Sequence, residues 1–193
     1  METGALKYIM NLLKTEYANE VALLHADIPE ITEIPTIRFM DAKEVIMKQF
    51  KYQPTDMKDF DPAEEEMLGK YAKKKFNSDF IFVTHYPSKK RPFYTMDDPE
   101  DPEYTLSFDL LFRGLEITSG GQRVHDYNEQ VEKMKRLGMD PEQFDTYLML
   151  HKYGAPPHGG LGIGLERLTM HLLGFKNVRE AAMFPRDINR VTP

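Results

Sequence analysis

The sequence of 193 residues contains no cysteine. Disulfide bonds, thiolate metal sites and a cysteine nucleophile are therefore excluded. The chain does not open with a basic and then apolar leader, and no apolar run approaches the ~20 residues that a membrane-spanning helix needs. We expect a soluble, cytoplasmic protein with no membrane partner.

The sequence also lacks an excess of positive charge. Its 25 lysines and arginines are outnumbered by 31 aspartates and glutamates, which gives a net charge of −6. Because phosphate attraction is local, nucleic acid would have to be held by a basic patch and not by the bulk charge. The composition argues against a dedicated nucleic-acid binder but permits an enzyme that docks one.

The length and the apolar content, 41% of residues, suit a single well-packed domain over residues 1–193. Hydrophobic periodicity and capping residues predict helices over 3–24, 62–75, 128–137, 141–150 and 165–173. A possible capping box of Asp41 and Glu44 predicts the start of one more helix. Aromatic and β-branched runs predict strands over 79–86, 91–96, 107–117 and 122–125. This order indicates an α+β fold, with a mostly antiparallel sheet and helices on one side.

The strand predicted over 107–117 is apolar on both faces, which is typical of the middle of a covered sheet. Glu116 would share a face with Phe108 and Leu110, where a lone carboxylate is costly to bury. Ser119 and Arg123 follow shortly after. From spacing alone, a structural ion pair of Glu116 with Arg123 is the simpler interpretation. The alternative is a Mg²⁺ site at Glu116 and Ser119, with Arg123 binding a carboxylate.

A glycine run, "HGGLGIGLER", leads into the last predicted helix, and Arg167 lies in its first turn. Glycine permits close approach of a ligand to the backbone, and helix N-termini bind phosphates. A cation at this end opposes the helix dipole. The alternative is glycine required for tight strand packing, with Arg167 in solvent or paired with an acid. The spacing fits neither G-x-x-x-x-G-K-[ST] nor G-x-G-x-x-G, so this stretch alone does not identify a phosphate site.

Three long blocks together resemble the C-terminal half of the catalytic domain of aspartyl-tRNA synthetases, in their archaeal and eukaryotic-like form. The blocks are "VTHYPSKKRPFYTM", "FDLLFRGLEITSGGQRVHDY" and "KYGAPPHGGLGIGLERLTMHLLGFKNVREAAMFPRDINRVTP". The resemblance covers nearly the whole chain, and "GLGIGLERL" is similar to the third signature motif of class II synthetases. It implies a class II fold, a mostly antiparallel sheet flanked by helices.

The resemblance also implies a role for each candidate residue. Arg167 is expected to bind the γ-phosphate of ATP, Glu116 to bind Mg²⁺ and ATP, and both to be catalytic. Ser119 is expected beside the metal and the amino acid, and Arg123 on the side-chain carboxylate of aspartate. The nucleotide site would also include the start of the helix, at Gly164, Leu165, Glu166 and Arg167.

In the intact family, these residues serve the ATP- and Mg²⁺-dependent conversion of L-aspartate to aspartyl-adenylate and its transfer to tRNA, in enzymes that can form homodimers. The first two class II motifs are not recognisable in residues 1–100, and the anticodon-binding domain is missing. The chain therefore resembles a fragment or a natural truncated relative, and we expect it to have little or no activity alone.

The resemblance leaves three alternatives. One is a fragment of the sister enzyme, asparaginyl-tRNA synthetase, although "QRVH" and "RPFYTM" are more similar to the aspartyl side. The second is a truncated paralogue that binds a nucleotide or a partner protein without catalysis. The third is an asparagine-synthetase-like, amide-forming enzyme built on the same scaffold.

Overall fold

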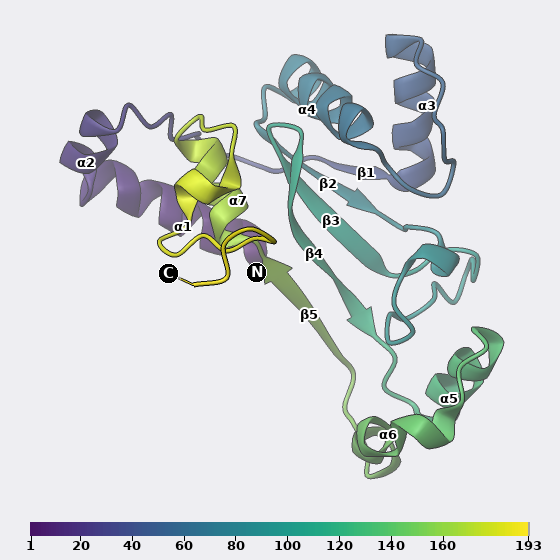
Figure 1. Cartoon of the computed structure of the whole chain (residues 1–193). Helices are drawn as coiled ribbons and strands as arrows, with labels where there is room; N and C mark the ends of the chain where they lie inside the picture. Colours follow the sequence, from purple (N-terminus) through teal and green to yellow (C-terminus); the bar gives the residue numbers. More distant parts are fainter. Residues whose placement is uncertain (193) are drawn as a thin grey trace.

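The computed structural model describes residues 1–192 and contains one five-stranded sheet with strand order β1-β2-β3-β4-β5 (Figure 1). The strands are β1 (Thr36–Arg38), β2 (Phe80–Thr84), β3 (Ser107–Phe112), β4 (Leu115–Arg123) and β5 (His158–Ile163). β1 runs parallel to β2, and every other neighbouring pair is antiparallel. The predicted α+β class with a mostly antiparallel sheet is confirmed.

Helices cover both faces of this sheet, so the prediction of helices on one side is wrong. The helices are α1 (Glu2–Thr15), α2 (Ala18–Leu23), α3 (Phe39–Phe50), α4 (Pro62–Phe76), α5 (Tyr127–Arg136), α6 (Asp145–Lys152) and α7 (Leu165–Leu172). α3 and α4 pack on Ile81, Val83 and Leu111, on what we call the α4 face. α1 and α7 pack on Phe80, Leu110 and Phe112, on the α7 face, while α5 and α6 lie at the far end of the sheet (Figure 1).

The expected helix over 3–24 is two helices. The Glu16 amide still bonds to the Leu12 carbonyl, but Tyr17 leaves the helical angles with φ −115° and ψ 25°. This break turns the chain, so that α2 brings Val21 and Leu24 to the same groove as α7. Hydrophobic spacing does not reveal such a break, because the apolar residues stay in phase across it.

Two helix starts were predicted, one from a capping box at Asp41 and Glu44 and one from Asp61-Pro62, and only the second is confirmed. Asp61 and Glu64 exchange side-chain-to-backbone hydrogen bonds of 2.9 Å at the start of α4. α3 instead begins at Phe39, after Arg38, with no side-chain cap, so Asp41 lies inside its first turn. The apolar contact of Phe39 with the core fixes this start, because its side chain is fully buried.

The prediction of one continuous strand over 107–117 is wrong, because the chain turns back at Arg113 and Gly114. Both residues have positive φ, 50° and 80°, which is the geometry of a tight hairpin turn. Arg113 is held there by Asp27 Oδ2 at 2.7 Å and by the His171 carbonyl at 3.1 Å. Of the strand predicted over 122–125, only residues 122 and 123 are in a strand, as the end of β4. The strand predicted over 91–96 is wrong, because these residues form turns with one bridge, Thr95 to Arg123.

The hairpin turn packs directly against α4. A side chain at Gly69 would place its Cβ 2.5 Å from the Gly114 nitrogen, and one at Gly114 would place it 2.7 Å from the Glu66 Cα. Glycine at both positions therefore allows the backbones to touch. This contact positions the first turns of α4 beside the start of β4.

A substitution at this contact tests it. We expect Gly69→Ala to lower the free energy of unfolding by about 1–3 kcal/mol, because the added methyl overlaps backbone atoms. Gly4→Ala is the matched control, since no atom lies within 4 Å of the position that its added methyl would take. There the better helix propensity of alanine should raise stability by up to about 1 kcal/mol. Urea unfolding followed by circular dichroism measures both, and equal effects would contradict the contact.

Candidate functional site

β4 contains one extra residue that brings the predicted site residues to one face of the sheet. Thr118 pairs with Leu110 and Glu116 with Leu111, so Ile117 has no partner of its own in β3. In a regular strand, Glu116 and Ser119 would point to opposite faces, because side chains alternate. The β-bulge places both on the α4 face, together with Arg123.

Glu116 and Arg167 meet at the start of β4. Arg167 Nη1 donates to the Glu116 carbonyl at 2.6 Å and lies 3.9 Å from Glu116 Oε1. The Arg167 side chain is 49% exposed, so part of the guanidinium remains accessible. The structure does not bring Glu116 to Arg123, so the ion pair considered from spacing is replaced by one with Arg167.

Glu65 of α4 joins this pair, although the sequence did not single it out. Its Oε2 accepts a hydrogen bond of 3.0 Å from the Glu116 amide. Burial raises the pKa of the Glu65 carboxyl to about 7, and the Glu116 and Asp109 carboxylates contribute to the rise. Burial likewise raises the pKa of Glu116, with Asp109 adding to it and Arg167 and Arg91 opposing it.

Ser119 lies in a second cluster, with Arg91 and Asp109. Arg91 Nη1 donates to Ser119 Oγ at 3.0 Å, and Arg91 Nη2 lies 2.5 Å from Asp109 Oδ2. The Arg91 guanidinium also lies 3.8 Å from the centre of the Tyr86 ring. Asp109 is buried, and its Oδ1 has no hydrogen-bond partner. The signal for Asp109 was present, because "SFDLLF" places one carboxylate in an otherwise apolar strand.

A cavity of about 400 Å³ opens between the end of β4, β5 and the segment that carries Arg91. Its lining includes Ser119, Arg123, Gly160 and Gly162. A Cβ at Gly160 would lie 3.1 Å from Arg123 Nη2, so the bare backbone leaves space for the guanidinium. Ion pairs between the described residues engage Arg91 and Arg167 but not Arg123, whose guanidinium lies 5.4 Å from the Tyr94 ring centre.

The glycine run is strand β5, which was not predicted. Gly160 and Gly162 pair with Gly121 and Ser119, so they lie on the cavity side of the sheet. Leu161 and Ile163 point to the opposite face. Because glycine alternates with an aliphatic residue from Gly160 to Ile163, the cavity side of this part of β5 carries no side chains.

Among the residues expected in the nucleotide site, the structure brings Gly164 and Arg167 beside β4. The Gly164 amide donates to the Ile117 carbonyl at 2.7 Å. Leu165 is 68% exposed and lines a groove with α1 and α2, while Glu166 is exposed in the first turn of α7. Nucleotide binding by Leu165 and Glu166 stays a prediction.

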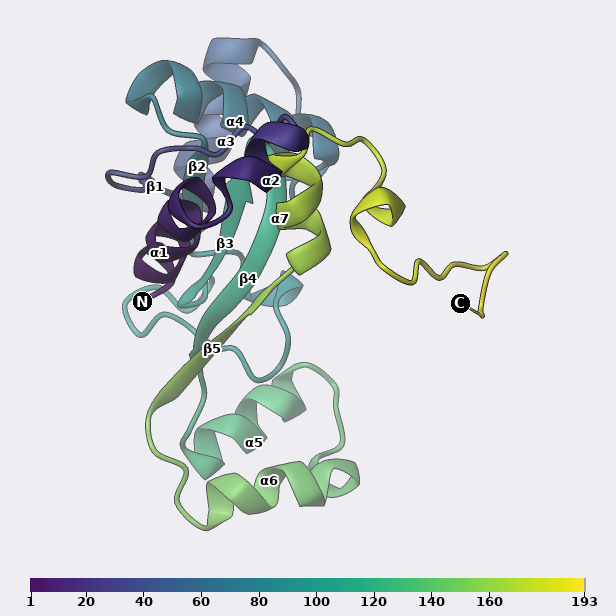
Figure 2. The ribbon, with the colours of Figure 1, turned by 90° about the vertical axis from the view of Figure 1, so that its left-hand side faces the viewer.

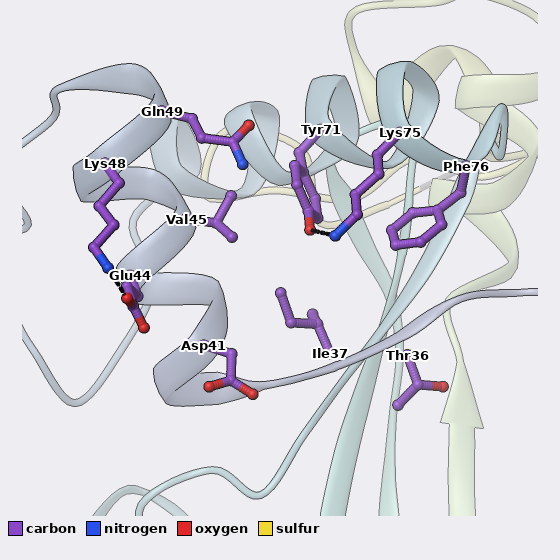
Figure 3. A pocket seen from close by; sticks show the side chains of 10 residues that line it. All are labelled: Thr36, Ile37, Asp41, Glu44, Val45, Lys48, Gln49, Tyr71, Lys75 and Phe76. Atoms are coloured by element: carbon purple, nitrogen blue, oxygen red, sulfur yellow. Dashed lines mark hydrogen bonds and ion pairs between the residues drawn. The ribbon is translucent and has the colours of Figure 1, made fainter.

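A second cavity, of about 340 Å³, lies between α3, the C-terminal end of α4 and β1 (Figure 3). Both of its lysines have local partners: Lys48 pairs with Glu44, and Lys75 Nζ lies 2.7 Å from the Tyr71 hydroxyl. None of the catalytic or binding residues predicted from the sequence lines this cavity. We therefore assign the candidate site to the cavity beside β4 and β5.

No three histidine, aspartate or glutamate side chains within residues 1–192 are grouped closely enough to hold a metal ion by themselves. No helix in this part of the chain is long and apolar enough to cross a membrane.

Comparisons of the sequence and of the structure with known proteins agree on one family. The family described as tRNA synthetases class II (D, K and N) matches residues 1–188. The aspartate–tRNA(Asp/Asn) ligase of Thermus thermophilus is 52% identical over 176 residues, which cover 91% of this chain and 41% of that protein. The chain thus spans less than half the length of this curated relative.

Solved structures agree with the sequence match. The aspartyl tRNA synthetase from Entamoeba histolytica has a TM-score of 0.79 at 39% identity, covering 84% of this chain and 33% of that one. The asparaginyl-tRNA synthetase from Pyrococcus horikoshii complexed with asparaginyl-adenylate has a TM-score of 0.85 at 31% identity, covering 100% and 44%.

The raised pKa of Glu65 predicts a pH-dependent stability. The folded chain holds the Glu65 proton more tightly than the unfolded chain does, so this contribution to stability is complete below pH 4.5 and is lost as the pH rises to about 7. Glu65→Gln should be increasingly stable relative to the wild type as the pH rises through this window. Urea unfolding at pH 5, 6, 7 and 8 measures the difference.

The control for this experiment is Glu66→Gln, because the Glu66 carboxylate is exposed and pairs with Lys70 on the helix surface. Its stability difference from the wild type should not change between pH 5 and pH 8. A flat difference for Glu65→Gln as well would show that Glu65 titrates like a solvent-exposed carboxylate.

Proposed function

Since this chain belongs to the class II tRNA synthetases of the D, K and N group, we propose that its site binds L-aspartate, ATP and Mg²⁺ and forms aspartyl-adenylate in the complete ligase. The observation that carries the proposal is Arg123, a guanidinium in a cavity of about 400 Å³ and outside the ion pairs formed among the described residues. The planar fork of arginine matches a carboxylate in a bidentate pair.

The reaction that these residues would serve is an in-line displacement. The α-carboxylate of aspartate attacks the α-phosphate of ATP, an O–P bond forms, and pyrophosphate leaves with the electron pair of the broken bond. The aspartyl group then passes to the 3′ end of tRNA. Such chemistry depends mainly on positioning and on stabilisation of the phosphate charge.

Arg167 is proposed to bind the terminal phosphate of ATP at the start of α7. A polyphosphate there would supply the anion that the helix N-terminus favours. In the free chain, the Glu116 carbonyl and carboxylate take that place, at 2.6 Å and 3.9 Å from Arg167 Nη1. The guanidinium is thus already oriented across the start of β4 by these contacts.

Mg²⁺ fits the oxygen ligands on the α4 face. Mg²⁺ is usually held by one or two carboxylates together with substrate phosphates. Glu116 and Ser119 are the proposed protein ligands, and Asp109 adds a buried oxygen, Oδ1, that has no hydrogen-bond partner. When bound, Mg²⁺ would neutralise phosphate charge. Arg91 keeps Ser119 Oγ and Asp109 Oδ2 in place through contacts of 3.0 Å and 2.5 Å.

The complete ligase is proposed to act in the cytoplasm, with tRNA contacts supplied largely by regions outside this chain. Asparagine is the competing substrate, because the similar structure from Pyrococcus horikoshii is complexed with asparaginyl-adenylate. Arg123 favours aspartate, since a neutral amide would leave its charge without a counter-ion in the cavity.

The isolated chain is expected to have little or no activation activity. The resemblance assigns an arginine for the α-phosphate to a motif that is not recognisable in residues 1–100. Aspartate-dependent pyrophosphate exchange by the purified chain measures this directly. The intact Thermus thermophilus relative serves as the positive control, and comparable rates for the two would contradict the expectation.

Arg123 is expected to select the acidic substrate. The chain should bind a non-hydrolysable sulfamoyl analogue of aspartyl-adenylate, seen as a thermal shift, more tightly than the asparaginyl analogue. Losing the charge-assisted pair in Arg123→Gln should weaken the aspartyl analogue by about 10- to 100-fold, as calorimetry would measure. Arg38→Gln is the control, because Arg38 is exposed and lies outside this cavity.

A further inference from the structure

Two buried polar side chains of α5 bind the chain segment that carries Arg91. Gln130 is fully buried and Lys133 is 3% exposed, although both residue types usually lie at the surface. Gln130 Nε2 donates to the Phe93 carbonyl at 3.0 Å, and Lys133 Nζ donates to the Thr95 carbonyl. Because positions three apart lie on one face of a helix, both donors reach the same stretch of backbone.

The Lys133 ammonium also pairs with a carboxylate at the end of this segment. Its Nζ lies 2.6 Å from Asp97 Oδ1. The same oxygen accepts a hydrogen bond of 2.6 Å from Ser88 Oγ, and Arg136 pairs with the other oxygen. Burial lowers the pKa of Lys133, and the hydrogen bond with Asp97 opposes this shift. The carboxylate thus closes residues 88–97 into a loop, and Lys133 binds the loop where it closes.

This loop forms part of the wall of the candidate site, and we call it the cavity wall. Residues 88–97 belong to no strand of the sheet, and they meet the end of β4 through the bridge between Thr95 and Arg123. Four residues of the wall line the cavity of about 400 Å³: Arg91, Pro92, Tyr94 and Thr95. Gln130 and Lys133 do not line it. The two α5 side chains therefore act on the site through the backbone that they bind.

Arg91 connects the cavity wall to the oxygen atoms of the site. Its Nη1 lies 3.0 Å from Ser119 Oγ, and its Nη2 lies 2.5 Å from Asp109 Oδ2. The guanidinium also lies 3.8 Å from the centre of the Tyr86 ring. A backbone shift of about 1 Å would take either oxygen outside the hydrogen-bonding range. The position of the cavity wall therefore decides whether Arg91 engages both oxygens.

We propose that Lys133 and Gln130 are positioning residues of the candidate site: they hold the cavity wall so that Arg91 keeps its contacts with the oxygen atoms proposed to surround Mg²⁺. Neither side chain touches the ligand. The expected effect on ligand affinity rests on the proposed function, whereas the effect on Arg91 does not. Residues that orient the groups in contact with a ligand are as necessary for tight binding as those groups themselves.

NMR of nitrogen-labelled arginine side chains tests the proposal without a ligand. In the wild type, the Arg91 Nε–Hε signal should be shifted by the Tyr86 ring and protected from exchange with water, because the guanidinium is paired and largely buried. Arg91→Lys identifies the signal by its absence. Lys133→Met removes the donor to the Thr95 carbonyl. The Arg91 signal should then move toward that of a free arginine and exchange about tenfold faster.

Three further variants control for charge and for stability. Lys135→Met removes an exposed ammonium from the same helix and should leave the Arg91 signal unchanged. Lys133→Arg keeps a cationic donor and should retain most of the shift. Leu6→Ala opens the core on the α7 face, where Leu6 is fully buried, and should lower stability but leave the Arg91 signal in place. A merely structural role of Lys133 would give Lys133→Met the same signal as Leu6→Ala.

The affinity for the sulfamoyl analogue of aspartyl-adenylate tests the consequence for the site. Calorimetry should show that Lys133→Met binds the analogue about tenfold more weakly than the wild type, because a displaced wall misaligns the groups that touch the ligand. Lys135→Met should bind the analogue like the wild type. Leu6→Ala should do the same at a temperature where it is folded.

Two results would overturn the proposal. One is an Arg91 signal that is the same in Lys133→Met and in the wild type. The other is an unchanged affinity for the analogue when that signal has moved. If the wild type does not bind the analogue, the proposed function fails, and the Arg91 signal alone decides the role of Lys133.

A second variant applies if Lys133→Met does not fold. Gln130→Met keeps the length of the side chain but removes the donor to the Phe93 carbonyl. The Arg91 signal should move in the same direction as expected for Lys133→Met. An unchanged signal in folded Gln130→Met would overturn the proposal in the same way.

Discussion

The candidate site depends on one extra residue in β4. Ile117 enters the core of the α7 face, and the strand then resumes its alternation with Ser119 on the α4 face. Without this bulge, Glu116 and Ser119 would lie on opposite sides of the sheet, and Arg123 would follow Ser119 away from Glu116. The same residue accepts the hydrogen bond from the Gly164 amide, so the bulge also fixes where α7 begins and where Arg167 can reach.

The charges of the site are arranged before any ligand arrives. Two arginines are already engaged, Arg91 with Asp109 and Ser119, and Arg167 with Glu116. In the proposed reaction, little further ordering of these side chains would be needed when phosphate or metal replaced part of these contacts. Arg123 differs, because an aromatic ring and not a carboxylate lies beside it. This difference separates the proposed phosphate and metal region, where the arginines are paired, from the part of the cavity where Arg123 is proposed to bind an acidic group.

Residue type and local chemistry made part of this structure predictable. The reciprocal hydrogen bonds of Asp61 and Glu64 fix α4, and its predicted start was correct. The hairpin at Arg113 was missed because the apolar pattern runs through the turn, and the turn is stabilised by Asp27 and α7, which are distant in sequence. β5 was missed because glycines suggest loops, although their alternation with Leu161 and Ile163 is a strand pattern. Glu65 could not be identified, because only packing distinguishes it from Glu64 and Glu66.

The hairpin turn joins the helical layers that cover the two faces of the sheet. Gly114 touches the backbone of α4 on one side, and Arg113 binds Asp27 and the last turn of α7 on the other. Figure 2 shows α1 and α7 nearer the viewer and α3 and α4 behind them. The two layers are therefore linked through this one turn. A displacement of α7 would pull on Arg113 and change how Glu65 meets the Glu116 amide. A continuous chain of contacts thus runs from α7 through the turn to the carboxylates on the α4 face.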